Sequence, residues 1–260
     1  MVPFDTALKI EARWFTHVLM NPSSTAMIRS LFINKEALEK GANRPEAPDQ
    51  SVRKVGILGA GMMGAGIAYV SAMAGIKVVL IDSTQEAAER GKSYSTGLLD
   101  KAISRRKSTE EKKAEVLSRI TATTDYAALA GCDLIVEAVF EDPKVKAEVT
   151  KRAEAVIPQD AIFATNTSTL PISELAKASA RPDQFIGIHF FSPVDKMLLV
   201  EIIKAARPAR ARWPRRSTSC ARSARRPSWS TTHASSTPTA ASSPISTKAS
   251  AWWPKGSAPR

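Results

Sequence analysis

The chain has 260 residues, enough for one large domain or two modest ones, and its 43% hydrophobic content suffices for a core. It has no run of about 18 uninterrupted apolar residues, which excludes a membrane-spanning helix, and its N-terminus lacks the apolar stretch of a secretory signal. Two cysteines, Cys132 and Cys220, form no disulfide framework, so we expect a cytoplasmic protein, and no residue pattern suggests a metal site.

Nearly all of the excess positive charge, +12 for the whole chain, lies in the C-terminal segment. Residues 205–260 hold 11 of the 37 Lys and Arg residues and none of the 25 Asp and Glu residues. The remaining 26 basic and 25 acidic residues give 1–204 a balance of +1. Because the apparent basicity comes from the C-terminal segment, we expect no nucleic-acid partner for the folded part.

Three zones follow one another along the chain. Residues 1–50 read as a helical linker segment, with helices expected over 6–20 and 25–40 and a Gly- and Pro-containing stop over 41–45. Residues 51–204 alternate apolar runs with amphipathic ones, which predicts an α/β domain: a Rossmann-type, doubly wound, mostly parallel sheet. We expect strands at 55–58, 77–81, 134–139, 161–164 and 185–188, and helices at 65–74, 85–103, 144–156 and 172–179.

A dinucleotide-binding fingerprint opens this domain. The strand over 54–58 leads directly into Gly59-Ala60-Gly61-Met62-Met63-Gly64, and an apolar helix rich in small residues follows. In such a motif the first glycine permits a tight turn, the second lets the backbone approach a pyrophosphate, and the third allows close helix packing. The helix N-terminus offers free N–H groups to the phosphates. The expected cofactor contacts here are Gly59, Gly61, Met62, Met63 and Gly64.

An acidic residue completes the fingerprint. Asp82 ends the second predicted strand, about 20 positions after the glycines. Its carboxylate can accept hydrogen bonds from the adenine-ribose hydroxyls and would repel a 2′-phosphate. The sequence therefore predicts NAD, rather than NADP, as the cofactor.

Three further motifs resemble the 3-hydroxyacyl-CoA dehydrogenase signature: TNTSTL at 165–170, GIHFFSP at 187–193 and LVEII at 199–203. The resemblance extends from about 51 to 204. Residues 1–50 are similar to the helical linker that precedes this domain in multifunctional fatty-acid oxidation α-subunits, whose enoyl-CoA hydratase domain is absent here. The resemblance implies oxidation of (S)-3-hydroxyacyl-CoA to 3-oxoacyl-CoA in β-oxidation, an acyl-CoA substrate, and a thiolase subunit as partner of the full-length parent.

The residues themselves indicate a base for alcohol oxidation. His189 follows an apolar strand, and parallel sheets present ligands at their carboxyl edge. The unperturbed pKa of histidine suits it to take a hydroxyl proton near neutral pH. Glu201, the single acid in an apolar run, could hold the imidazole in one tautomer. A satisfied core histidine is the competing interpretation.

The resemblance assigns further roles. It makes His189 the base and Glu201 its partner, and it makes Ser168 a hydrogen-bond donor to the substrate oxygen. It places Glu141 and Lys146 near the nicotinamide half of the cofactor and adds Ser192 as a cofactor contact, at a position where many family members have Asn. A helix N-cap or turn role competes for Ser168, and ordinary surface charge competes for Glu141 and Lys146.

Residues 205–260 depart from the family pattern. They are rich in Arg, Ser, Thr, Pro and Ala and contain no Leu and no Val, so we expect them to be disordered. One interpretation is a basic arm that binds nucleic acid or an acidic surface. We favour a frameshift, because codons chosen for 227–240 and read two nucleotides later give Leu-Val-Val-Asp-Asp-Ala-Arg-Phe-Phe-Tyr-Ala-Asn-Arg, which resembles the family's continuation.

A frameshift would remove the helical domain that binds acyl-CoA and forms the dimer, so activity is expected to be impaired. Two alternatives remain open at this point. One is a non-catalytic NAD-binding module or an interaction protein that works through its basic tail. The other is a Rossmann dehydrogenase that acts on another β-hydroxyacid.

Overall fold

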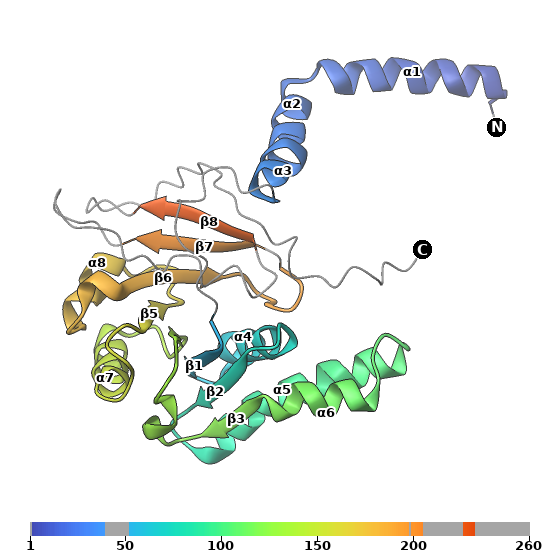
Figure 1. Ribbon diagram of the computed structural model, residues 1–260. Coiled ribbons are helices and arrows are strands. Elements are labelled where there is room, and N and C mark those ends of the chain that lie inside the picture. The colour runs from blue at the N-terminus through green and yellow to red at the C-terminus, as the bar shows by residue number, and fades with distance from the viewer. Residues whose placement is uncertain (1, 40–51, 198, 205–225, 232–260) are drawn as a thin grey trace.

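The computed structural model describes residues 2–39, 52–197, 199–204 and 226–231. Within these residues, eight strands form one sheet in the order β3-β2-β1-β4-β5-β6-β7-β8 (Figure 1). Neighbouring strands are parallel except for the antiparallel pair β6 and β7. The strands are β1 Lys54–Leu58, β2 Lys77–Ile81, β3 Ile120–Thr123, β4 Leu134–Glu137, β5 Ile162–Thr165, β6 Phe185–Phe190, β7 Leu199–Lys204 and β8 Arg226–Thr231. This order confirms the predicted Rossmann-type sheet.

Helices precede the sheet and connect its strands. The N-terminal ones are α1 Phe4–Met20, α2 Pro22–Ile28, the π-helical turn η1 Arg29–Ile33 and α3 Asn34–Glu39. The connecting ones are α4 Met62–Met73, α5 Gln85–Ser104, α6 Glu110–Ser118, α7 Pro143–Glu154 and α8 Ile172–Leu175, with short 3-10 segments η2 Tyr126–Leu129, η3 Ala176–Ala178 and η4 Pro182–Gln184. In Figure 1, α4 and α7 lie on opposite sides of the sheet.

Alternate side chains of the strands supply two separate cores. In β1, Val55 and Ile57 join the cluster that packs against Ile67 of α4. Leu58 points to the other face and joins the cluster containing Phe163 and Ile172. Because both faces of a parallel sheet are covered, its strands are apolar on both sides.

The N-terminal helices lie apart from these cores. In Figure 1, α1 extends away from the sheet, and none of its residues is buried. The large apolar side chains Phe4, Trp14 and Phe15 are exposed. The two predicted helices are therefore present as helical structure, but the second begins at Pro22 and is interrupted by η1. The expected stop at 41–45 falls outside the described residues.

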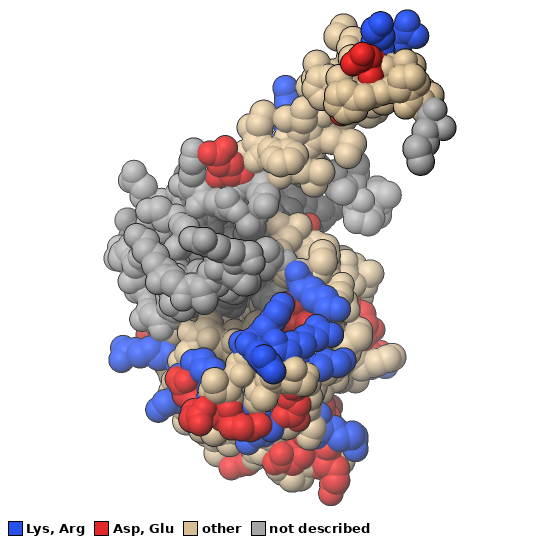
Figure 2. Space-filling view, turned by 90° about the vertical axis from the view of Figure 1, so that its right-hand side faces the viewer, with Lys and Arg blue, Asp and Glu red and all other residues tan. Residues whose placement is uncertain are grey.

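The charged side chains on one face of the molecule are mixed in sign. Figure 2 shows Lys and Arg gathered at the centre of the lower part, bordered by Asp and Glu, whereas the helices at the top carry few charges. This mixture agrees with the near balance of 26 basic and 25 acidic residues in 1–204. Among the described residues, no helix combines the length and apolar character needed to cross a bilayer.

The predictions and the structure differ in the strands near the sheet's edges. Helix α6 and strand β3 were not predicted, because α6 buries only Val116 and β3 only Ile120. Disorder was predicted for 205–260; within that segment the structure describes Arg226–Thr231, which pairs in parallel with β7 as strand β8. The rest of that segment, 205–225 and 232–260, lies outside the described residues.

Cys132 is expected to be chemically inert in the native protein. Its side chain is 0% exposed, and burial raises the pKa of its thiol to about 11. Because the thiolate is the reactive form, iodoacetamide should label Cys132 only after unfolding. Peptide mass spectrometry before and after denaturation measures this. Rapid labelling of Cys132 under native conditions would contradict the packing between β4 and η2.

Candidate active site and cofactor site

The turn between β1 and α4 contains glycines that close contacts require. Gly59 has a φ of +94°, and a Cβ there would lie 2.5 Å from the Ala138 carbonyl oxygen. A Cβ on Gly64 would overlap the Gly59 carbonyl oxygen, so α4 approaches the turn this closely only with glycine at that position. At Gly61, a Cβ would meet no atom within 4 Å. The backbone of Gly61 therefore faces open space at the N-terminus of α4.

Asp82 lies beside this turn at the end of β2. Its Oδ2 accepts a hydrogen bond from the Ala60 N–H at 2.7 Å, and its Oδ1 accepts one from the Ser83 N–H at 2.7 Å. The carboxylate thus joins the glycine turn to the second strand, where an adenosine ribose is bound in this fold. It lines a pocket with Ala60, Gly61, Met62, Ala65, Ser83, Thr84, Ala87, Arg90, Gly91 and Tyr94.

His189 and Glu201 face each other across the antiparallel pair of strands. The two residues are direct partners in the register of β6 and β7, and His189 Nδ1 lies 2.9 Å from Glu201 Oε2. The His189 side chain is 20% exposed and that of Glu201 36% exposed. An Nδ1–H that donates to Glu201 leaves the lone pair on Nε2, as a base requires. The exposed fraction argues against a histidine enclosed in the core.

Asn166 secures the end of the strand that carries His189. Its Oδ1 accepts a hydrogen bond at 2.9 Å from the N–H of Phe190, the residue that follows His189. Its own N–H donates to the Glu137 carbonyl oxygen at 2.7 Å. Asn166 therefore connects the ends of β4, β5 and β6.

Ser168 is presented by a tight turn after β5. Its side chain is exposed, whereas the preceding Thr167 is 3% exposed. The Thr167 hydroxyl oxygen accepts hydrogen bonds from the Leu170 N–H at 3.0 Å and from the Thr169 N–H at 3.3 Å. Thr167, rather than Ser168, thus performs the structural role in this turn, and the Ser168 hydroxyl faces outward.

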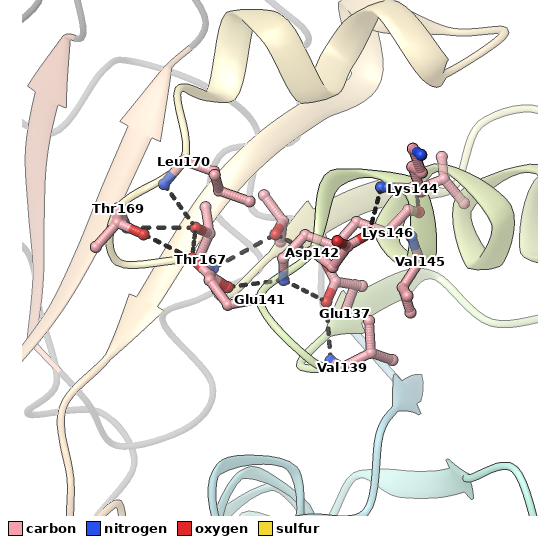
Figure 3. Close-up of polar contacts among 12 residues, drawn as sticks. Glu137, Val139, Glu141, Asp142, Lys144, Val145, Lys146, Thr167, Thr169 and Leu170 are labelled. Carbon is pink, nitrogen blue, oxygen red and sulfur yellow. Dashed lines mark hydrogen bonds and ion pairs between the residues drawn. The ribbon is translucent and has the colours of Figure 1, made fainter.

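Glu141 and Lys146, both predicted cofactor contacts, form an ion pair, and Lys146 forms a second ion pair with Glu137 (Figure 3). Lys146 Nζ lies 3.1 Å from Glu141 Oε2 and 2.8 Å from Glu137 Oε1. Lys146 is 2% exposed and Glu137 1% exposed, so neither is a surface charge. Glu141 Oε1 accepts hydrogen bonds from the hydroxyls of Thr167 and Thr169, the two residues that flank Ser168.

Glu141 is held in its ionised form. Partial burial by itself would raise the pKa of this carboxyl group. The hydrogen bonds from Thr167, Lys146 and Thr169 and the charge of Lys146 outweigh burial, and the pKa is lowered from its ordinary value. Glu141 therefore carries a negative charge at neutral pH.

The loop after β6 packs against helices α4 and α5. Ser192 Oγ lies 3.9 Å from the sulfur of Met62, next to the glycine turn. The hydroxyl of Tyr94 on α5 donates to Asp195 Oδ1 at 3.2 Å. A Cβ on Gly66 would lie 2.7 Å from Val194, so this loop also contacts α4 closely.

The structure thus joins half of the predicted site residues in pairs: His189 with Glu201, Glu141 with Lys146, and Met62 with Ser192. Sequence reasoning gave no role to Glu137 or Asn166. Glu137 had the same signal as Glu201, a single acid inside an apolar run, and Asn166 stood within the motif that contains Ser168. Neither residue type reveals its hydrogen-bond partner from sequence alone.

Comparisons with known proteins agree on one family. The family described as 3-hydroxyacyl-CoA dehydrogenase, NAD binding domain, matches residues 54–220. The fatty acid oxidation complex subunit alpha of Psychrobacter cryohalolentis is 38% identical over 203 residues, 78% of this chain and 28% of that protein. The chain therefore spans about 28% of the length of this relative.

Solved structures give the same result. The (S)-3-hydroxybutyryl-CoA dehydrogenase of Ralstonia eutropha is 34% identical with a TM-score of 0.64, over 70% of this chain and 64% of that one. The dehydrogenase part of a multifunctional enzyme from C. elegans is 27% identical with a TM-score of 0.63, over 78% of this chain and 48% of that one. The chain belongs to the 3-hydroxyacyl-CoA dehydrogenase family and contains its NAD-binding domain.

Proposed function

We propose that this chain is the NAD-dependent dehydrogenase part of a β-oxidation enzyme, which oxidises (S)-3-hydroxyacyl-CoA to 3-oxoacyl-CoA. The 2.9 Å contact between His189 Nδ1 and Glu201 Oε2 carries the proposal. An imidazole oriented by a carboxylate, at the sheet edge that also holds the glycine turn, supports the role of a base. The names of the relatives support the substrate class, since they include a fatty acid oxidation complex subunit and a 3-hydroxybutyryl-CoA dehydrogenase.

The residues at the glycine turn fit NAD. The open space at Gly61 admits a pyrophosphate against backbone N–H groups, and Asp82 offers carboxylate oxygens to ribose hydroxyls. Bound NAD⁺ would supply the acceptor for the hydride that leaves the substrate carbon. Asp82 would also disfavour the 2′-phosphate of NADP.

His189 would take the hydroxyl proton of the substrate at Nε2. The imidazolium that forms is stabilised by Glu201 across the strand pair, so proton transfer leaves no uncompensated charge. Ser168, exposed at the tip of its turn, would donate a hydrogen bond to the substrate oxygen. These roles for His189, Glu201 and Ser168 rest on the geometry together with the family resemblance.

We further propose that 205–260 is read out of frame. The segment has no acidic residue, no Leu and no Val. Strand β8 begins at Arg226, next to the point where the shifted frame supplies Leu-Val-Val. Sequencing the coding DNA tests this directly, and a shifted frame that yields no family-like continuation would remove the idea.

The proposed activity is measured as NADH formation from (S)-3-hydroxybutyryl-CoA. A frame-restored gene product should reduce NAD⁺ readily, while a chain whose residues 205–260 are read out of frame should be impaired. NADP⁺ should be a much poorer oxidant, since Asp82 repels a 2′-phosphate. An inactive frame-restored protein would contradict the proposed function. Equal rates with NADP⁺ would contradict the role of Asp82.

The cellular context is proposed on the same basis. We infer a cytoplasmic location from the two isolated cysteines and the metabolic class of the relatives. For the full-length parent we infer association with a thiolase subunit, since the relative from Psychrobacter cryohalolentis is described as a subunit of a complex.

A further inference from the structure

Three charged side chains between the end of β4 and the first turn of α7 form one cluster, in which Glu137 and Lys146 are buried and Glu141 is partly exposed. Glu137 ends β4 and accepts hydrogen bonds from Lys146 Nζ and from the Val139 N–H, both at 2.8 Å. Its second oxygen accepts the hydroxyl of Thr165 at 2.7 Å. With Glu141 bonded to the other side of Lys146, two carboxylates share one ammonium group (Figure 3). The formal charge of this cluster is −1.

Stability gives no reason for such a cluster. Burying Glu137 and Lys146 at 1% and 2% exposure costs several kcal/mol of desolvation per ion, which an ion pair only partly offsets. A well-packed apolar pair of similar volume would serve the fold as well or better. The burial of this pair therefore calls for a functional explanation.

The strand order indicates which half of a bound dinucleotide would lie near the cluster. Asp82 on β2 marks the adenosine side of the crevice, and the glycine turn after β1 marks the pyrophosphate. The other half of the dinucleotide extends over the carboxyl ends of β4 and β5, on the opposite side of β1. Glu137 ends β4, and Glu141 follows it in the loop before α7. The nicotinamide half of bound NAD would thus lie on the side of the cluster.

The negative charge of Asp142, next to Glu141, is offset locally by the N-terminus of α7. Asp142 caps α7, where its Oδ1 accepts the N–H groups of Lys144 and Val145 at 2.8 and 3.0 Å. Its negative charge is set against the positive end of the α7 dipole. Glu141, whose side chain is 37% exposed, is the member of the cluster through which the excess charge reaches the surface.

We propose that the cluster of Glu137, Lys146 and Glu141 favours the oxidised cofactor, because its excess negative charge attracts the positively charged nicotinamide of NAD⁺ and not the neutral ring of NADH. The cluster therefore raises the affinity for NAD⁺ relative to that for NADH. This inference rests on the proposed function only in that the chain binds NAD.

The test compares the dissociation constants of NAD⁺ and NADH, measured by calorimetry on the full chain. Glu141→Gln keeps an acceptor for the Thr167 and Thr169 hydroxyls and removes the excess charge. The ratio of NAD⁺ affinity to NADH affinity should fall about tenfold, the scale of a unit charge acting near a protein surface. Glu137→Gln should shift the ratio in the same direction. Melting temperatures identify the variants that remain folded.

Glu148→Gln is the matched control. Glu148 also lies on α7, but its side chain is 72% exposed, so solvent screens its charge and the ratio should not change. Equal weakening of NAD⁺ and NADH in Glu141→Gln would show a purely structural role and overturn the proposal, as would an unchanged ratio. A wild-type chain that binds neither form would instead overturn the proposed function, and this inference with it.

Discussion

Replacement of His189 by Gln is expected to lower the rate of NADH formation in the frame-restored enzyme by about a thousandfold, within the range for loss of a general base. Gln cannot take up the hydroxyl proton, although its amide can still donate a hydrogen bond to Glu201. NAD binding should change little, because His189 belongs to β6, while the glycine turn follows β1 and Asp82 follows β2. Stopped-flow absorbance and calorimetry measure the two quantities separately.

Glu174→Gln is a suitable control for this substitution. Glu174 lies on α8 with a side chain that is 61% exposed and pairs only with Lys177 among the contacts of the described residues. Its replacement should leave both rate and affinity unchanged. If His189→Gln loses NAD affinity and rate together, His189 has a structural role, and the assignment of the base must be abandoned.

Alanine at Gly61 and at Gly64 should produce opposite kinds of damage. A methyl group at Gly61 meets no protein atom within 4 Å, so Gly61→Ala should keep its stability. The same methyl group occupies the space where a pyrophosphate approaches, and NAD should bind at least about tenfold more weakly, a loss of roughly 1.4 kcal/mol. At Gly64 the methyl group would overlap the Gly59 carbonyl oxygen and cost on the order of 3 kcal/mol of unfolding free energy.

The two glycine variants are compared by urea unfolding and by NAD titration of the full chain. Each variant is the control for the other, since they lie three residues apart in one turn. A Gly61→Ala protein that unfolds as easily as Gly64→Ala would show that the turn has no open side. A Gly61→Ala protein with unchanged NAD affinity would show that the cofactor does not approach there.

The central sheet could be predicted from sequence because β1, β2, β4, β5 and β6 are continuous apolar runs, and their alternation with helices dictates a parallel order. Strand β3 and helix α6 escaped prediction because each buries a single residue and so gives no periodic signal. Arg226–Thr231 escaped prediction because the sequence of β8, RPSWST, contains a proline and lies in a segment without Leu or Val.

Some residues of the candidate site could be predicted from the sequence, and others could not. His189 and Glu201 could be identified from their surroundings, since each is a polar residue at the end of or within an apolar strand. Glu137 carried the same signal but was read as part of a strand over 134–139. Its partners Lys146 and Thr165 lie nine and 28 residues away, and only the paired β4 and β5 ends bring them together. The burial of Lys146 could not be predicted, because the helix that contains it is otherwise polar.

The pairing of β6 with β7 has a consequence for how the enzyme can vary. Because His189 and Glu201 are opposite residues in one antiparallel ladder, the backbone hydrogen bonds fix their separation, and the loop between the strands does not. Insertions or deletions in that loop are expected to leave the imidazole and the carboxylate in place. A single residue added within either strand moves one of the two side chains to the other face of the sheet and separates them. We therefore expect length changes in the loop between β6 and β7 to be tolerated, and length changes within either strand to be disabling.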